Sequence, residues 1–125
     1  MNTIIPPNEV PAYIFFDGKQ KTLKATRRIR QGETILNLPT KIRQNPDKYS
    51  LEVYPSVHLD CEFHMVGAIN HSCDPNASVK DTRIVAWSCI NPGDEIKIDY
   101  KKTEQKLAVP FDCNCGSTNC RGRIE

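Results

Sequence analysis

The sequence predicts a mainly β protein made of short strands, and three observations support this prediction. Nine prolines and six glycines in 125 residues interrupt the chain too often for long helices. Apolar residues recur in short runs that turn-forming residues bound, which is typical of strands. Hydrophobic residues at 38% and charged residues at 26% are ordinary for a globular protein. A chain of this length is expected to form one domain around one core.

The first part of the chain predicts a β-hairpin and a third strand. A proline-rich arm leads into an apolar run, Asp17-Gly18 supplies a turn that favours positive φ, and an alternating segment follows. Pro39 ends the next apolar run, because proline cannot donate a hydrogen bond to a sheet. The expected strands cover residues 13–16, 22–29 and 34–38.

The middle and end of the chain predict a less regular segment and then more strands. Between residues 40 and 60 we expect a helical turn after Asn45 and an extended stretch at 50–53. Apolar spacing allows a short helix within residues 61–69, and the polar segment 70–76 is too hydrophilic for a core strand. Further strands are expected at residues 77–79, 83–90 and 95–100.

Charge argues against a nucleic-acid partner, and the lack of a long apolar stretch argues against a membrane span. The net charge of +2 is small and dispersed, whereas duplex binding relies on clustered phosphate contacts. The basic residues between Lys19 and Arg30 alternate with apolar ones and fit a solvated strand face. No stretch approaches the roughly 20 apolar residues of a membrane span, and the first residues lack the features of a signal peptide. We expect a soluble intracellular protein of the cytoplasm or nucleus.

The cysteine spacing predicts a metal site. Cys113, Cys115 and Cys120 place three thiols in eight residues, together with glycines that let the chain curl. Tetrahedral zinc needs a fourth ligand. Cys73 is preferred because it alone lies in a polar, turn-forming segment. A disulfide is the weaker alternative, because Cys113 and Cys115 are too close in sequence to bridge easily. The other candidates are Cys61, Cys89, His58, His64 and His71.

Two cysteines have a simpler interpretation. Cys61 and Cys89 stand among apolar neighbours, where a cysteine usually acts as a small buried hydrophobe. The series His58, Cys61, His64 is a weaker metal candidate, because its members lie three residues apart without the glycines of a zinc knuckle.

Three motifs in order resemble a known family. They are Asn70-His71-Ser72-Cys73-Asp74-Pro75-Asn76, then Gly93-Asp94-Glu95-Ile96-Lys97-Ile98-Asp99-Tyr100, then the Cys-x-Cys-x4-Cys tail. Together with the strand-turn-strand pattern of residues 25–35, they resemble the SET-domain protein-lysine methyltransferases with a post-SET zinc motif. The resemblance covers roughly residues 22–124.

The resemblance implies a fold, an activity and a set of site residues. The fold is a SET-type β-clip of short sheets with a knot-like crossing and a zinc-binding C-terminal tail. Residues 1–21 would form an arm and first strand, 22–100 the SET domain, and 101–125 a linker and post-SET motif. The activity is methyl transfer from S-adenosylmethionine to lysine. Implied site residues are Tyr100 for catalysis; Asn70, His71, Tyr100 and Phe111 for the cofactor; and Cys73, Cys113, Cys115 and Cys120 for zinc.

Three positions depart from the family pattern. Gln20-Lys21-Thr22 stands where relatives usually carry a Gly-x-Gly loop, and Gly67-Ala68 replaces a common Arg-Phe pair. Ile98 stands where many relatives carry an aromatic residue that limits how many methyl groups fit, so the number of methyl groups added is not set by the pattern.

The resemblance also implies partners, and two other functions stay open. The expected substrate is a protein or peptide lysine, such as one in a histone-like basic tail, and the small size allows a homodimer. The alternatives are a catalytically inactive SET fold that binds peptides or partners, and a zinc-stabilised interaction module.

Overall fold

The computed structural model describes residues 10–62 and 64–125, and it is mainly β. Most of the expected N-terminal arm lies outside the described residues. No helix within the described ranges is long and apolar enough to cross a membrane. The strands are β1 (Ala12–Phe16), β2 (Lys21–Ala25), β3 (Thr34–Asn37), β4 (Ile42–Arg43), β5 (Ser50–Tyr54), β6 (Val57–Asp60), β7 (Asn70–His71), β8 (Ala77–Lys80), β9 (Arg83–Ala86), β10 (Lys97–Ile98), β11 (Phe111–Asp112) and β12 (Arg123–Ile124), with 3-10 helices η1 (Met65–Ala68) and η2 (Tyr100–Lys102).

The predicted hairpin forms from β1 and β2, which pair antiparallel. The Asp17 side chain accepts hydrogen bonds from the backbone N–H groups of Lys19 and Gln20, and Gly18 has φ of +95°. The second strand ends at Ala25 and does not continue to Ile29 as predicted. Ile29 instead forms an isolated bridge with Ile90, which draws the chain toward the core.

Two three-stranded sheets make up the body. The predicted strands β3, β8 and β9 form one sheet in the order β3-β9-β8. The other has the order β4-β6-β5, and of its strands only β5 was predicted. The β5–β6 hairpin turns at Ser56, a non-glycine residue with φ of +65°, which sequence patterns rarely reveal. β4 has two residues, too few to show alternation.

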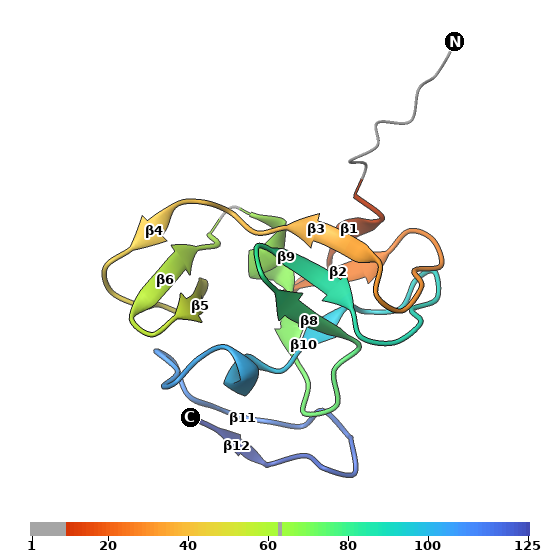
Figure 1. Ribbon diagram of the computed structural model, residues 1–125. Coiled ribbons are helices and arrows are strands. Elements are labelled where there is room, and N and C mark those ends of the chain that lie inside the picture. Colours follow the sequence, from red (N-terminus) through yellow and green to blue (C-terminus); the bar gives the residue numbers. More distant parts are fainter. Residues whose placement is uncertain (1–9, 63) are drawn as a thin grey trace.

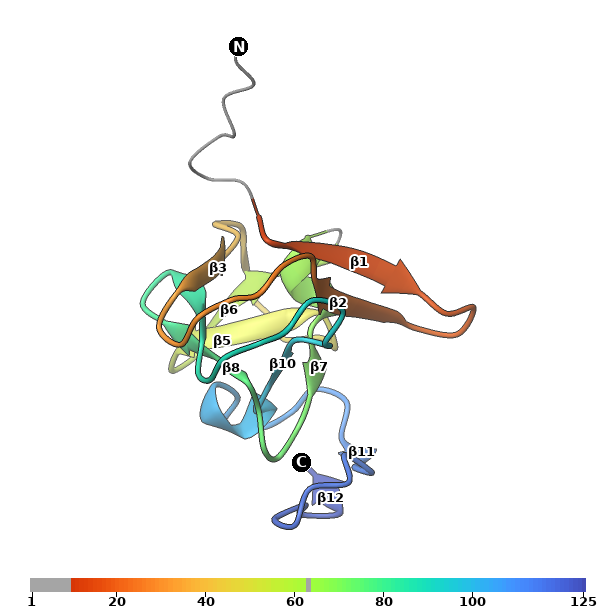
Figure 2. The same ribbon diagram turned by 90° about the vertical axis from the view of Figure 1, so that its right-hand side faces the viewer.

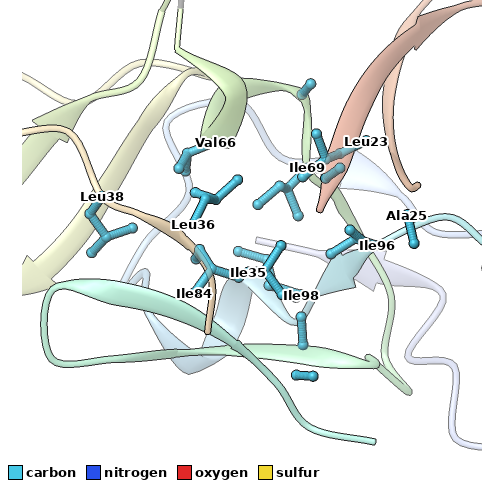
Figure 3. Close-up of a cluster of buried hydrophobic side chains, with 14 of the residues drawn as sticks. Leu23, Ala25, Ile35, Leu36, Leu38, Val66, Ile69, Ile84, Ile96 and Ile98 are labelled. Carbon is cyan, nitrogen blue, oxygen red and sulfur yellow. The ribbon is translucent and has the colours of Figure 1, made fainter. Parts of the chain in front are cut away.

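A single main core lies between these sheets. Figure 3 shows Leu23, Ile35, Ile84, Ile96 and Ile98 converging from several strands, and the first four have an exposed fraction of 2% or less. Both views place the C-terminal strands β11 and β12 at the end of the molecule opposite the β1–β2 hairpin (Figures 1 and 2).

The polar segment after η1 is more buried than its sequence predicts. β7 pairs with β10 in parallel, and both His71 and Ser72 are buried. The prediction that this segment is no core strand is wrong for its first two residues. Burial is tolerated because the polar atoms have partners within the fold: Ser72 Oγ accepts from Asp74 N, and His71 Nδ1 accepts from Tyr100 N.

The last predicted strand is shorter than expected. Only Lys97 and Ile98 of residues 95–100 belong to β10, and Tyr100 begins η2. The Asp99 side chain caps η2 by accepting a hydrogen bond from Lys101 N. This cap ends the extended backbone just before the tyrosine.

Gly67→Ala is expected to destabilise the fold. A Cβ at position 67 would lie 2.4 Å from the carbonyl oxygen of Cys61, and a backbone atom cannot move aside cheaply. Overpacking of this kind costs about 1–3 kcal/mol of unfolding free energy, which urea denaturation would measure. Ser88→Ala, at an exposed site, is the control. Equal unfolding midpoints for the two variants would contradict this account of the close approach.

Candidate active site and metal centre

A cavity of about 670 Å³ lies where the parallel strands β7 and β10 meet the C-terminal segment. Its walls include Asn70 and His71 from β7, Ile98 from β10, Tyr100 from η2 and Phe111 from β11. The volume is within the range of small-molecule and cofactor pockets. The structure thus brings together all four residues that the resemblance assigned to the cofactor.

Tyr100 is held at both ends. Its hydroxyl donates a hydrogen bond to the carbonyl oxygen of Ile69 at 2.6 Å, and its backbone N–H donates to His71 Nδ1 at 3.0 Å. Burial, reinforced by the carboxylates of Glu104 and Glu95, raises the pKa of Tyr100 above its ordinary value. The phenol therefore remains neutral at physiological pH and presents an oxygen whose proton is already engaged.

His71 lies between the tyrosine and a cysteine. Its side chain is 2% exposed, and Nε2 lies 3.3 Å from Cys73 Sγ. Because Nδ1 accepts from Tyr100 N, the neutral ring carries its proton on Nε2 and donates it to the sulfur. Burial lowers the pKa of His71, although Asp99 opposes the shift. The imidazole is therefore neutral and has one tautomer.

Three rings form one side of the cavity. His71 and Tyr100 have centroids 5.2 Å apart, and Phe111 lies edge-on to both, at 5.6 Å from His71 and 6.0 Å from Tyr100. These are favourable aromatic geometries. Phe111 belongs to the tail, so the tail contributes directly to this wall.

Asn70 connects the β1–β2 hairpin to the segment that leads into β10. Its side-chain N–H group donates to the Lys21 carbonyl at 3.2 Å and to Glu95 Oε2 at 2.8 Å. These bonds fix the amide orientation at the edge of the cavity, next to the segment that replaces the family's glycine loop.

Four cysteines form a second site beside the cavity. The sulfurs of Cys73, Cys113, Cys115 and Cys120 all lie within 4.8 Å of one another. For zinc–sulfur bonds of about 2.3 Å, tetrahedral geometry places sulfurs about 3.8 Å apart, and Cys73 and Cys113 are 3.9 Å apart. Hydrogen bonds from Ser117, and smaller contributions from Cys73 and Cys120, lower the pKa of Cys115 to about 5, whereas burial raises the pKa of Cys113 to about 12. The cluster fits a tetrahedral metal ion.

The remaining cysteines behave differently from each other. Cys61 is 2% exposed and packs in the main core, as predicted. Cys89 is exposed, so the prediction of a buried hydrophobe is wrong. It follows β9 in a loop where Trp87 is also exposed, and its sulfur accepts a hydrogen bond from Arg28 Nε at 3.2 Å. Within residues 10–62 and 64–125, the series His58, Cys61, His64 does not gather into a metal-like group.

The sequence analysis missed the pair Asp99 and Arg121. The Asp99 side chain is 1% exposed and accepts two hydrogen bonds from the Arg121 guanidinium, one of them 3.0 Å long. Burial opposes ionisation of Asp99, but the bonds from Arg121 outweigh it and hold its pKa below the ordinary value. Asp99 precedes Tyr100 in the sequence and Arg121 follows Cys120. Their position next to predicted site residues is the sequence signal that could have indicated them.

The fold and the site define a small β protein in which a four-cysteine centre adjoins a tyrosine-walled pocket. Residues 20–101 match the SET domain family, more than half of the chain. The chain therefore belongs to the SET domain family.

Curated relatives match part of the chain. The "Methyltransferase flvH" of Aspergillus flavus is 33% identical over 60% of this chain and 44% of its own length. The "Histone-lysine N-methyltransferase met-2" of Caenorhabditis elegans is 35% identical over 64% of this chain and 7% of its own. "Histone-lysine N-methyltransferase SETD1B" of Homo sapiens is 42% identical over 45% and 3%. The chain thus spans less than half the length of these relatives.

Two solved structures share the fold. The crystal structure of KRYPTONITE in complex with mCHG DNA and SAH superposes with a TM-score of 0.73 at 22% identity, over 91% of this chain and 29% of that one. The complex of KRYPTONITE with mCHH DNA, H3(1-15) peptide and SAH gives a TM-score of 0.70 at 23% identity, over 94% and 30%.

The cysteine cluster predicts one metal ion per chain, measurable by elemental mass spectrometry of the purified protein. Cys73→Ser should lower the metal content and increase amide hydrogen exchange in residues 111–125, because the tail would lose its ligand from the body. Cys89→Ser, at an exposed cysteine outside the cluster, is the control. Full metal content in Cys73→Ser would remove this residue from the ligand set.

Proposed function

We propose that this chain transfers methyl groups from S-adenosylmethionine to lysine side chains of proteins. The observation that supports the proposal most is the neutral Tyr100 hydroxyl, fixed at the wall of the cavity by its bond to the Ile69 carbonyl. Family membership and relatives that are named histone-lysine N-methyltransferases support it further. One of the structural neighbours is a complex with an H3(1-15) peptide and SAH.

The cofactor would lie in the cavity against Asn70, His71, Tyr100 and Phe111. The cavity is large enough, and its aromatic wall suits an adenine ring and an aliphatic sulfonium chain. S-adenosylmethionine supplies an electrophilic methyl group on a positively charged sulfur. Phe111 comes from the tail, so we expect zinc in the four-cysteine centre to hold this part of the cavity closed.

The protein's own task is to position a neutral amine. A lysine with pKa near 10.4 must lose its proton to solvent, which costs about 5 kcal/mol at pH 7. The amine nitrogen then attacks in line, the new N–C bond forming as the S–C bond breaks. The Tyr100 hydroxyl proton is bonded to the Ile69 carbonyl. The Tyr100 oxygen can therefore accept weak C–H···O hydrogen bonds from the methyl group and orient the amine. Because Tyr100 stays neutral, it does not act as the base that removes the lysine proton.

Two acidic side chains lie near Tyr100. Glu95 and Glu104 lie close enough to raise the pKa of the phenol, and both line the cavity. Four lysines, Lys19, Lys21, Lys48 and Lys97, line the cavity as well, and burial raises the pKa of Glu104. The charge of the lining is therefore mixed. We propose a basic, histone-like peptide as substrate, which the names of the relatives and the neighbouring complex with an H3(1-15) peptide support. We also propose an intracellular location and functional units at residues 22–100 and 101–125.

Tyr100→Phe should lower the methyl-transfer rate by about 10²–10³, because the oxygen that orients the amine is lost. Labelled cofactor and a library of basic peptides, followed by mass spectrometry, would measure this. Tyr54→Phe, at a tyrosine 73% exposed, is the control. Calorimetry should show unchanged cofactor binding in both variants. A wild-type protein that binds the cofactor and peptides without turnover would instead support the inactive SET fold.

The methyl-transfer rate should rise with pH by about tenfold per unit between pH 7 and 9, because the fraction of neutral lysine rises in that way. The raised pKa of Tyr100 means that the phenol loses no protons in this window and adds no descending limb. Single-turnover measurements of kcat/KM across buffers would test this. A rate that falls above pH 8 while the fold persists would contradict a neutral tyrosine.

A further inference from the structure

We propose that His71 and the Asp99–Arg121 pair couple the four-cysteine centre to Tyr100, so that metal binding sets the position of the tyrosine. His71 acts here as a positioning residue through its side chain. The inference rests on the proposed role of Tyr100 in methyl transfer.

The first connection passes through one imidazole ring. Tyr100 N donates to Nδ1 at 3.0 Å, and Nε2 lies 3.3 Å from Cys73 Sγ. Both ring nitrogens are thus used, one toward Tyr100 and one toward Cys73. The imidazole is rigid and its side chain is 2% exposed. A displacement of the sulfur at Nε2 is therefore transmitted through Nδ1 to the backbone of Tyr100.

The second connection runs through the tail. Arg121 follows the last cysteine, and its backbone N–H donates to Cys73 Sγ at 3.4 Å. Its guanidinium binds both oxygens of Asp99, whose carboxylate also accepts from Lys101 N. Asp99 is the N-cap of η2, the helix that Tyr100 begins. The loop that closes the metal centre therefore holds the cap of the helix that carries the tyrosine.

Both connections converge on Cys73 and on the backbone of residues 99–101. A bound ion would fix the sulfur of Cys73 against the three sulfurs of the tail, and this sulfur is the contact of both His71 Nε2 and the Arg121 backbone N–H. Partners of this kind orient metal ligands, and their removal typically costs about 10–100-fold in metal affinity. Loss of the ion would free Arg121 and the Cys73 side of His71, while the bonds of Tyr100 to Ile69, Thr103 and Glu104 would remain.

The test uses 3-fluorotyrosine and ¹⁹F NMR, with the Tyr100 signal among four tyrosines assigned through Tyr100→Phe. In the wild type, removing the metal with a chelator should shift or broaden the Tyr100 signal. In His71→Phe, which keeps an aromatic ring but no nitrogen, that response should be lost or strongly reduced. Competition with a chromophoric chelator should show a metal affinity about 10–100-fold lower in His71→Phe than in the wild type. Neither readout requires methyl transfer.

His58→Phe is the matched control, since it makes the same change at a half-buried histidine whose Nδ1 has no partner in the described structure. It should retain both the metal affinity and the Tyr100 response. An undiminished Tyr100 response or unchanged metal affinity in His71→Phe would overturn the proposal.

If His71→Phe does not fold, Arg121→Lys decides through the second connection. Lysine keeps the charge but not the paired N–H groups that bind Asp99. A reduced Tyr100 response to metal removal would support the coupling, and an undiminished one would overturn it. Intact coupling in a protein without methyl transfer would count against the proposed function alone.

Discussion

The attachment of the C-terminal tail through Cys73 is the constraint on which the site depends. The tail has a separate small hydrophobic cluster, built from Leu107, Cys113 and Ile124 together with Cys73, and its strands have two residues each. So little apolar surface cannot hold a segment in place alone. Cys73 is the cluster member from the middle of the chain, and it brings the tail, with Phe111, to the cavity.

Hydrogen bonds supplement this attachment where apolar contact is scarce. Asn119 donates to the Cys73 carbonyl, and Lys101 Nζ donates to the carbonyl of Glu125 at 2.7 Å. The ion pair of Arg121 and Asp99 is shielded on the aspartate side, where the carboxylate is 1% exposed. A buried carboxylate is costly unless it is fully hydrogen-bonded. The tail therefore stabilises the body as well as depending on it, because Arg121 satisfies Asp99.

Much of the fold could be predicted because its signals are local. The β1–β2 hairpin has its turn residues, the strands β3, β8 and β9 have their apolar runs, and the spacing of three tail cysteines indicates a missing ligand. The strands β4 and β6 could not be predicted, because they are too short to show alternation and are stabilised by pairing within the β4-β6-β5 sheet. The exposure of Cys89 and the pairing of Asp99 with Arg121 depend likewise on tertiary contacts, which no local pattern encodes.

The shortened strand before Tyr100 shows why a failed prediction can mark a candidate functional site. The first N–H groups of a helix have no partners within the helix. Because Tyr100 begins η2, its N–H is available for His71 Nδ1, and the next N–H is taken by the Asp99 side chain. The break in the alternating pattern is thus what lets a buried histidine connect the tyrosine with the cysteine centre.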